Sequence, residues 1–388
     1  MIDRLLSVYL LEAVQQMPVV AVTGPRQSGK STLVQRCFPN YTYRNLEDIE
    51  QRRFALNDPK GFLLDVGSQA IIDEVQYVPD LLSYMQVAVD QNNRPGQFII
   101  SGSQNLLLMQ SVAQSLAGRV AIFNLLPFSL EELSQTPYEL SRYEEYILKG
   151  FYPRIYDQNL NATNWLLDYI QTYVERDVRQ LLNVQDLNTF RQFLEICAGR
   201  IGQLVNLSEI GQLIGVSYQT VNKWLGVLQT SFIIHTLRPY HQNFNKRIVK
   251  TPKLYFYDTG LACVLLNLKT TDDLNRHFAK GALFENLVIN EVLKNGLNRH
   301  TPSRAYFWNA AGAHEIDLIL DQGGKLWPIE IKSGRTINER FFDGLRYFQQ
   351  VSGATPAESR LVYGGDDTQK RSIAQVLSWK QIHQIPLL

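Results

Sequence analysis

Short runs of apolar residues divide the N-terminal third of the chain, and each run ends in small or polar residues. Residues 18–23, 69–75 and 97–104 have the pattern of buried strands because branched aliphatic side chains dominate them. Residues 40–46 form a further candidate strand, and residues 51–65 have the pattern of a helix. Strands that alternate with helices predict an α/β fold with a parallel sheet, whose binding site lies at the carboxyl ends of the strands.

A complete phosphate-binding motif, G-x-x-x-x-G-K-[ST], follows the first of these strands. Its residues are Gly24, Pro25, Arg26, Gln27, Ser28, Gly29, Lys30, Ser31 and Thr32. The glycines allow several backbone N–H groups to point at one anion, Lys30 adds a positive charge for the β- and γ-phosphates, and the Ser31 hydroxyl is a Mg²⁺ ligand. A solvated glycine-rich turn is the alternative, but the apolar strand before the motif favours a site for ATP and Mg²⁺.

Polar residues at the ends of the next strands complete a predicted ATPase site. Asp73 and Glu74 end the second buried strand, where Asp73 is expected to hold Mg²⁺ and Glu74 to polarise the attacking water. Ser101 or Ser103, at the tip of the third strand, is expected to orient that water. Arg119 precedes a last strand and is a candidate arginine finger, in cis or on a neighbouring subunit. The alternatives are a solvated acidic turn, a plain strand-terminal turn and a structural arginine.

These motifs, in this order, resemble a group of prokaryotic AAA-type P-loop ATPases. The shared features are the phosphate motif, the strand through Asp73-Glu74, the Ile100–Ser103 tip and the Ala117-Gly118-Arg119 turn. The resemblance extends over nearly the whole chain and implies a C-terminal domain of uncharacterised function. It also implies that Ser103 acts as a nucleotide sensor.

Composition narrows the class of protein. The chain has 388 residues, which predicts two to four domains. Its net charge of +1 creates no overall electrostatic attraction to nucleic acid or to a membrane. Cys37, Cys197 and Cys263 lie far apart, which argues against a disulfide framework or a zinc site. Residues 1–12 have the pattern of an amphipathic helix, and no run is long and apolar enough to span a bilayer. We therefore expect a cytoplasmic, soluble protein.

The middle of the chain is rich in helical patterns. Residues 130–194, including a long amphipathic helix around 173–178, are expected to form a helical lid or a plain connector. Residues 207–214 and 218–228 predict two helices joined by a turn at 215–217, the layout of a helix-turn-helix. The candidate reading residues are Ser217, Gln219, Thr220, Asn222 and Lys223.

Two candidate wing strands follow, at residues 231–234 and 253–257, and together these elements predict a winged helix. The loop at 238–247 between them is basic and contains aromatic residues, which suits contact with a phosphate backbone. The predicted reading helix carries few basic residues. A protein–protein or interdomain module is therefore the alternative to DNA contact.

Carboxylates and a lysine recur on adjacent elements of the C-terminal region. Glu285 lies in an apolar helical segment, and Asp317 lies in a strand that a Gly323-Gly324 turn joins to Glu330-Ile331-Lys332. Alternation places Glu330 and Lys332 on one face, near Asp317, where Asp317 and Glu330 can hold Mg²⁺ and activate water. The order resembles the PD-(D/E)xK nuclease superfamily, although no proline precedes Asp317. An inactive relic of that fold and a salt-bridged hairpin are the alternatives.

These features predict four segments: an ATPase domain at 1–135, a lid or connector at 136–200, a winged helix at 201–265 and a nuclease-like α/β domain at 266–388. We expect a Mg²⁺-dependent ATPase whose nucleotide state is coupled to DNA or RNA binding or processing. The alternative is an ATP-switched scaffold for a protein partner, with an inactive nuclease-like domain. The sequence does not decide whether the protein forms a homo-oligomer. No membrane partner is expected.

Overall fold

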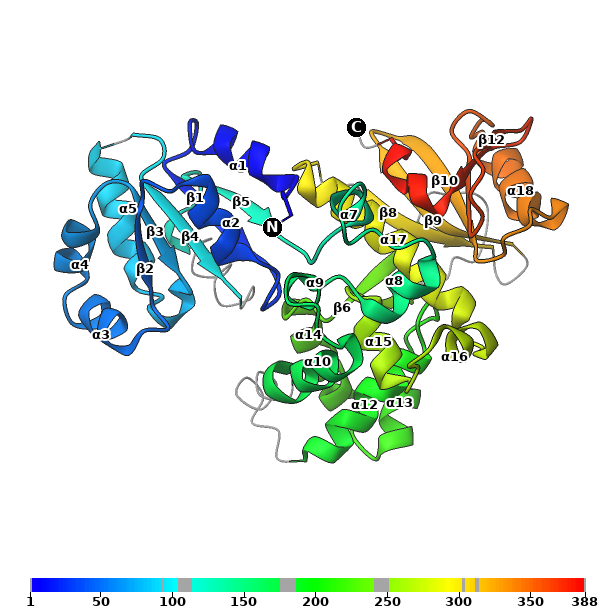
Figure 1. The fold of residues 1–388 in the computed structure, drawn as a ribbon, viewed down its shortest axis with the longest axis horizontal. Helices are drawn as coiled ribbons and strands as arrows, with labels where there is room; N and C mark the ends of the chain where they lie inside the picture. Colours follow the sequence, from blue (N-terminus) through cyan, green and yellow to red (C-terminus); the bar gives the residue numbers. More distant parts are fainter. Residues whose placement is uncertain are drawn as a thin grey trace. The chain divides into compact units, whose positions relative to one another are not determined.

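A computed structural model describes residues 2–92, 94–103, 114–174, 186–240, 251–301, 304–310 and 314–386 (Figure 1). The chain divides into two compact units. The first comprises Met1–Phe128, Thr230–Phe232 and Leu297–His300, and the second comprises Ser129–Gln229, Ile233–Gly296 and Thr301–Leu388.

The first unit contains a parallel sheet with helices on both faces, as predicted (Figure 1). Its strands are β1 (Val19–Thr23), β2 (Thr42–Asn45), β3 (Ala70–Asp73), β4 (Phe98–Gly102) and β5 (Val120–Asn124). Its helices are α1 (Leu6–Ala13), α2 (Lys30–Cys37), α3 (Ile49–Asn57), α4 (Pro59–Val66), the 3₁₀ turn η1 (Val75–Tyr77) and α5 (Leu81–Asn92). The strand order is β2-β3-β4-β1-β5, so β4 separates the strand before the phosphate motif from the strand that ends in Asp73.

Burial on both faces explains the continuous apolar runs of this sheet. Val20 and Val22 of β1 belong to a core cluster with α1 and α2, whereas Val19 and Ala21 belong to a cluster with α3, α4 and α5. A strand buried on both faces has no polar positions to alternate with its apolar ones.

The predicted helix at 51–65 is two helices. Pro59 begins α4, and its ring cannot continue α3 because it lacks an N–H and clashes with the preceding turn. Asp58 ends α3 and caps α4, where its Oδ1 accepts a hydrogen bond of 2.9 Å from the N–H of Gly61.

The second unit combines helices with an extended mixed sheet. Its helices up to residue 276 are α7 (Leu130–Leu133), α8 (Tyr143–Lys149), α9 (Pro153–Asp157), α10 (Ala162–Tyr169), the π-helical η2 (Ile170–Val174), α12 (Leu187–Gly199), α13 (Leu207–Ile214), α14 (Tyr218–Thr230), α15 (Thr259–Leu265) and α16 (Thr271–Arg276). The later ones are α17 (Lys280–Asn298), η3 (Glu339–Phe342), α18 (Asp343–Ser352) and η4 (Trp379–Gln384). Its strands are β6 (Ile234–Pro239), β7 (Lys253–Phe256), β8 (Arg304–Asn309), β9 (Glu315–Gln322), β10 (Lys325–Lys332), β11 (Arg360–Tyr363), β12 (Gln369–Lys370) and β13 (Gln375–Ser378).

Strands from the middle of the chain extend the C-terminal sheet. Among the described residues the order is β12-β13-β11-β10-β9-β8-β6-β7. β6 and β7 are antiparallel, as expected of wing strands, but β6 also pairs in parallel with β8 through Arg238 and Tyr306. The predicted bounds 231–234 are wrong for the first of these strands, because Phe232 has a φ of +57° in a turn and β6 begins only at Ile234.

The helix-turn-helix order is confirmed at α13 and α14, which are joined by a turn in which Gly215 has a φ of +72°. A positive φ at this helix end suits glycine, which has no Cβ to clash. The winged-helix fold stays a prediction. Residues 241–247 of the basic loop, residues 175–178 of the predicted amphipathic helix and Gln104 lie outside the described residues.

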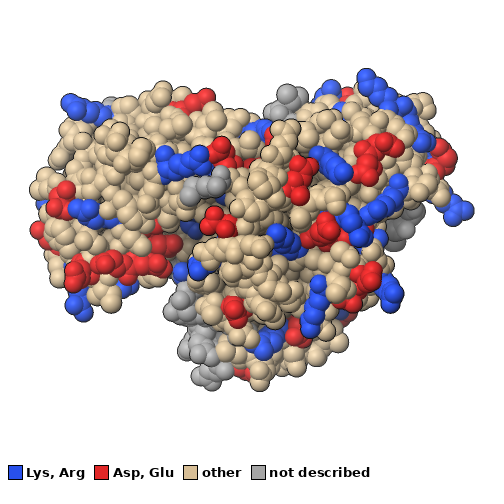
Figure 2. Space-filling model, in the orientation of Figure 1, with Lys and Arg blue, Asp and Glu red and all other residues tan. Residues whose placement is uncertain are grey.

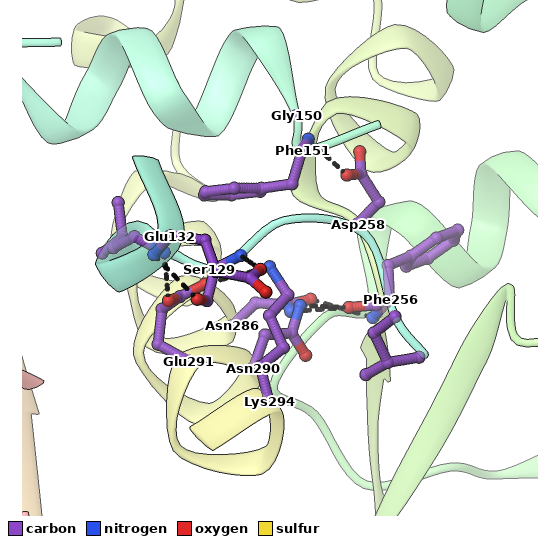
Figure 3. Close-up of polar contacts among 12 residues, drawn as sticks. Ser129, Glu132, Gly150, Phe151, Phe256, Asp258, Asn286, Asn290, Glu291 and Lys294 are labelled. Carbon is purple, nitrogen blue, oxygen red and sulfur yellow. Dashed lines mark hydrogen bonds and ion pairs between the residues drawn. The ribbon is translucent and has the colours of Figure 1, made fainter. Parts of the chain in front are cut away.

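Polar side chains of α17 anchor β7 inside the second unit (Figure 3). Asn286 pairs with the backbone of Phe256 in both directions: its Nδ2 donates to the carbonyl at 2.7 Å and its Oδ1 accepts from the N–H at 2.9 Å. Asn290 Nδ2 donates to the same carbonyl at 2.7 Å. Both asparagines are buried, so these bonds satisfy groups that water cannot reach. Side chains from the C-terminal part of the chain thus contribute to holding β7, which also pairs with β6.

Candidate functional site

The phosphate motif forms a tight loop between β1 and α2. Gly24 has a φ of +146°, and a Cβ there would lie 2.1 Å from the carbonyl oxygen of Leu125, so only glycine fits. Gln27 and Gly29 also have positive φ values, of 63° and 93°. A sequence of such residues turns successive N–H groups inward, which is the geometry that binds an anion.

Lys30 is buried at the start of α2 and lies against this loop. Its Nζ donates hydrogen bonds of 3.0 Å and 2.9 Å to the carbonyl oxygens of Gly24 and Pro25. Burial lowers the pKa of Lys30, and the nearby charges of Glu74 and Asp73 oppose that shift. The buried hydroxyl of Ser28 has no hydrogen-bond partner in the structure. An unpaired buried hydroxyl in the loop that the Lys30 ammonium contacts fits a site for an oxygen-rich anion.

Arg4 supports the loop from the N-terminal segment and was missed by sequence analysis. Its guanidinium donates hydrogen bonds of 2.8 Å and 2.6 Å to the carbonyl oxygens of Ser28 and Leu126. The guanidinium also lies 5.0 Å from the ring centre of Phe128. An isolated arginine near the N-terminus gives no local signal for such a role.

The acidic pair lies beside the loop, because β3 and β4 end at the same edge of the sheet as β1. Asp73 accepts hydrogen bonds from Tyr43 at 2.7 Å and from Ser101. Glu74 has a φ of +54°, and its Oε2 accepts a hydrogen bond of 3.1 Å from the hydroxyl of Ser103. The structure thus brings together both acidic residues and both candidate serines.

Mg²⁺ fits this end of the sheet. Ser31 hydrogen-bonds to the hydroxyl of Tyr43, and the same hydroxyl donates to Asp73. The two predicted Mg²⁺ ligands, the Ser31 hydroxyl and the Asp73 carboxylate, therefore both contact Tyr43. Hard oxygen ligands of this kind are those that Mg²⁺ prefers. Burial and the charge of Asp73 raise the pKa of Tyr43, which keeps its hydroxyl as a donor.

Arg119 is not near the phosphate loop of its own chain. Its backbone carbonyl accepts from the N–H of Val19, at the start of β1, so it lies at the amino edge of the sheet. The loop lies at the other end of β1, roughly 13–16 Å away at about 3.3 Å per residue. The guanidinium pairs with Asp90, with Nη2 2.9 Å from Oδ2. The cis alternative is therefore wrong for this structure, and a role on a neighbouring subunit stays a prediction.

A second candidate site is a pocket of about 470 Å³ in the second unit. It is lined by Gly202, Lys253, Glu285, His314, Glu315, Asp317, Glu330, Lys332, Asp343 and Gly344. All four residues predicted for the nuclease-like site, Glu285, Asp317, Glu330 and Lys332, are among them. Sequence analysis missed Lys253, which comes from β7 in the middle of the chain.

The β9–β10 hairpin positions the carboxylates of this pocket. Ile329 pairs with Leu318, so Glu330 and Asp317 come next on the two strands. Lys332 Nζ lies 2.5 Å from Glu330 Oε1 and 3.6 Å from Asp317 Oδ2. These distances confirm that alternation places Glu330 and Lys332 on the face that Asp317 shares.

Burial and interactions between charged groups shift the pKa values of the side chains in this pocket. Burial, followed by the charge of Asp317, raises the pKa of both Glu285 and Glu330. Burial lowers the pKa of Lys253 and Lys332, but the surrounding carboxylates together outweigh burial and the net shift is upward. Both lysines are therefore charged at neutral pH.

Two carboxylates, from Asp317 and Glu330, lie at one end of this pocket. Oε2 of Glu330 is buried and has no hydrogen-bond partner, and Asp317 uses its Oδ2 to accept a bond of 2.7 Å from the N–H of Ile331. In the described part of the chain no group of three or more His, Cys, Asp or Glu side chains is arranged so that it could hold a metal ion. Lysines lie between the carboxylates of the pocket instead, as the salt bridges of Lys253 and Lys332 show.

Charges of both signs are interspersed on the face that Figure 2 shows, in keeping with the net charge of +1. Of the helices that the structure describes, none combines the length and the apolar character needed to cross a bilayer.

Three family models match successive parts of the chain: an AAA domain at residues 16–134, a domain of unknown function (DUF8612) at 140–272 and a domain of unknown function (DUF4143) at 280–382. Among curated proteins, the uncharacterized proteins Rv2008c of Mycobacterium tuberculosis and Mb2031c of Mycobacterium bovis are each 30% identical over 332 residues. Each alignment covers 84% of this chain and 73% of the relative. The chain belongs to the family of these mycobacterial proteins. An uncharacterized protein of Haemophilus influenzae is 24% identical, over 81% of this chain and 82% of the relative.

The AAA domain match confirms the first resemblance: the N-terminal part of this chain is an AAA-type P-loop domain, which supports ATP binding. The resemblance to nucleases stays a prediction. Among solved structures, a Walker-type ATPase of Pyrococcus abyssi aligns with 67% of this chain and 94% of its own, at 15% identity and a TM-score of 0.42. AMPPCP-bound DnaA from Aquifex aeolicus aligns with 57% and 85%, at 12% identity and a TM-score of 0.30.

Proposed function

We propose that this protein binds and hydrolyses ATP at the phosphate loop and that its nucleotide state is coupled to nucleic-acid binding or processing at the pocket in the second unit. The observation that supports hydrolysis is the pair formed by Glu74 and Ser103, 3.1 Å apart at the edge of the sheet where the loop lies. A half-buried carboxylate held by a hydroxyl is suited to orient and polarise a water molecule.

Each residue of the ATP site has a distinct role in this proposal. The loop N–H groups and Lys30 bind the phosphates, and Ser31 and Asp73 hold Mg²⁺. When bound, Mg²⁺ supplies charge neutralisation at the phosphate oxygens. Glu74 accepts a hydrogen bond from the attacking water, and Ser103 keeps the Glu74 carboxylate oriented toward it.

Nucleic-acid processing is proposed for the pocket because Glu285, Asp317, Glu330 and Lys332 converge there. Asp317 and Glu330 would hold a divalent cation, which supplies Lewis-acid activation of water and phosphate. Lys332 donates a proton or a hydrogen bond toward the same face, 2.5 Å from Glu330. This arrangement supports phosphodiester hydrolysis as the reaction class.

A protein partner is the second candidate function, and it is supported by the exposed surface of the helix-turn-helix. Leu213 at the end of α13 and Tyr218 at the start of α14 are 61% and 50% exposed. Apolar side chains at this position suit a protein surface better than a phosphate backbone. In this alternative, ATP controls partner binding and the pocket does not cleave.

The test is ATP hydrolysis with and without DNA or RNA, with cleavage of the nucleic acid measured in the same samples. Lys30→Ala is expected to abolish hydrolysis and Glu330→Gln to abolish cleavage alone. The matched controls are Lys60→Ala and Glu339→Gln, which change exposed residues of the same types outside both sites. A rate of ATP hydrolysis that does not change when nucleic acid is added, together with no cleavage of the nucleic acid, would favour the protein-partner alternative.

A further inference from the structure

Three basic side chains gather around the start of α8 in the second unit. Two of them pair with the same carboxylate: Arg335 Nη2 lies 3.2 Å from each oxygen of Glu144, and Arg142 Nε lies 3.6 Å from its Oε2. The third is Lys280, at the start of α17, whose Nζ lies 5.9 Å from the ring centre of Tyr143. Arg142, Lys280 and Arg335 are called the basic cluster below.

Buried groups hold the two arginines at the surface. The Glu144 side chain is only 2% exposed, whereas those of Arg142 and Arg335 are 40% and 57% exposed. Tyr143 is buried as well, and its hydroxyl donates a hydrogen bond of 2.9 Å to the carbonyl of Ser333, two residues before Arg335. A guanidinium has five N–H groups, so donors remain for a ligand at the surface after the pairing with Glu144.

The basic cluster carries more positive charge than its own partners neutralise. Among the described residues, Glu144 is the one carboxylate that forms an ion pair with any of its three members. Lys280 donates instead to the uncharged Asn275, with Nζ 2.7 Å from Oδ1. Asp366, which follows β11 at the same edge of the sheet, pairs with Lys380 at 2.8 Å. Three cations and one paired carboxylate leave two positive charges.

Two elements lead from the basic cluster to the pocket. Lys280 lies five residues before Glu285 on α17, which is about 7.5 Å along a helix. Arg335 lies three residues after Lys332, the pocket lysine at the end of β10, and three residues span at most about 11 Å. The basic cluster and the pocket are therefore neighbours within one unit.

The spread of the three charges suits a phosphodiester backbone better than a small anion. Lys280 lies over the ring of Tyr143, whereas the charges of Arg335 and Arg142 act on its hydroxyl, where they oppose the rise in its pKa that burial causes. The cations therefore do not converge on one point. A nucleic acid presents a row of phosphates, and arginine binds phosphate with two parallel hydrogen bonds.

We propose that the basic cluster binds the phosphodiester backbone of a nucleic acid and holds it beside the pocket. This inference rests on the proposed function in taking nucleic acid as the ligand of the second unit, but it does not require cleavage. Glu144 is a positioning residue, since it holds both guanidinium groups and does not itself bind phosphate. The basic cluster would supply phosphate contacts that the predicted reading helix, with few basic residues, does not.

The test measures the binding of a labelled DNA duplex by fluorescence anisotropy at several salt concentrations, with and without ATP. Every sample carries Glu330→Gln, which is expected to abolish cleavage, so that binding is measured on intact DNA. Each phosphate contact contributes about −0.9 to the slope of log K against log salt concentration. Arg335→Gln and Lys280→Gln are each expected to make that slope shallower by about 0.9 and, at about 0.1 M salt, to weaken binding about eightfold. Arg335→Lys keeps the charge and is expected to keep the slope.

Lys370→Gln is the matched control, because Lys370 is an exposed lysine of β12 that pairs with Gln375, at the opposite end of the sheet from Lys332. It is expected to bind DNA like the parent. Lys280→Gln keeps the test informative if Arg335→Gln does not fold, since the bond that Lys280 makes is to Asn275 and not to the buried Glu144.

The outcomes separate the basic cluster from the processing reaction, which is measured on the protein that retains Glu330. Shallower slopes in both variants without any cleavage by that protein would support the inference and refute processing. Cleavage, together with slopes in both variants equal to that of the parent, would overturn the inference and leave processing intact. No binding of DNA or of a matched RNA would overturn both. Displacement of the DNA by polyglutamate at the same concentration of charge as unlabelled duplex would assign the basic cluster to an acidic protein and overturn the inference.

Discussion

Tyr43 donates a hydrogen bond of 2.7 Å to Oδ2 of Asp73, while Ser101 donates to Oδ1 of the same carboxylate. Tyr43 lies on β2 and Ser101 on β4, the two strands that flank β3 in the sheet. The carboxylate proposed to hold Mg²⁺ is thus oriented from both neighbouring strands. Tyr43 contributes to the site although it lies outside the phosphate-binding motif.

Tyr43→Phe is expected to raise the Mg²⁺ concentration that gives half-maximal ATP hydrolysis by about tenfold. A hydrogen bond to a charged group contributes at least ~1.5 kcal/mol, and without it Asp73 is free to rotate. Tyr41→Phe is the matched control, because the Tyr41 hydroxyl donates to the carbonyl of Gly96 and not to the site. An unchanged Mg²⁺ requirement in Tyr43→Phe would show that Ser101 alone orients Asp73.

Gly24→Ala is expected to abolish nucleotide binding and to lower stability. The new Cβ would lie 2.1 Å from the carbonyl oxygen of Leu125, so the loop must move away from β5. We expect a loss of about 1–3 kcal/mol in the free energy of unfolding, as for other overpacked sites. Gly67→Ala is the control, since Gly67 also has a positive φ but a Cβ there meets nothing within 4 Å. Equal losses in the two variants would mean that backbone strain, and not the close contact, limits Gly24.

The buried ion pair of Glu291 and Lys294 is expected to be sensitive to loss of either partner. Lys294 Nζ lies 2.9 Å from Glu291 Oε1, and both side chains are almost inaccessible to water. Lys294→Met would leave an uncompensated carboxylate and is expected to cost about 3–5 kcal/mol of unfolding free energy.

The double variant Glu291→Gln, Lys294→Met is expected to recover much of that loss, because it leaves no buried charge. The glutamine side chain also retains an oxygen for the N–H of Leu130, which in the parent donates to Glu291 at 2.6 Å. Urea denaturation of the parent, the Lys294→Met variant and the double variant measures the difference. A double variant that is no more stable than Lys294→Met would contradict this expectation.

His235 is expected to make the second unit sensitive to acid. Burial lowers its pKa to about 4, and its Nε2 lies 2.9 Å from Oδ1 of Asn290. The unfolded chain binds a proton near the ordinary pKa of about 6.5, but the folded chain does not. The contribution to stability is therefore present above pH 6.5 and is lost as pH falls toward 4, by about 3 kcal/mol in total.

Urea denaturation at several pH values between 7.5 and 4.5 measures this loss. His235→Gln is expected to be less stable than the parent at pH 7.5, with a difference that shrinks as the pH falls. The exposed His383→Gln serves as the control and is expected to follow the parent at every pH. A constant difference between His235→Gln and the parent would contradict the assignment.

The sequence predicted those site residues whose partners are set by local patterns. Lys30 lies in a contiguous motif, and Glu330 and Lys332 follow from strand alternation beside a glycine turn. Tyr43 and Lys253 were missed because each reaches its site only through strand pairing with distant segments. A lysine in an apolar strand has no periodic signal that distinguishes a buried charge from an edge residue.

Arg119 shows a different kind of error. Its turn was recognised, but its place in the sheet follows from chain direction: a residue before a parallel strand lies at the amino edge, whereas the phosphate motif follows β1 and lies at the carboxyl edge. That argument was available from the order of elements alone. The split of residues 51–65 at Pro59 was likewise readable from the proline.

The pairing of β6 with β8 has a practical consequence for anyone who dissects this family. A fragment that starts at residue 280 would leave the edge of β8 without its neighbour, and open strand edges promote aggregation. Such a fragment would also lack Lys253, the ion-pair partner of Glu285 and Glu315. The boundary between the two domains of unknown function runs through a single sheet, so chimeras between relatives should not be joined at that boundary.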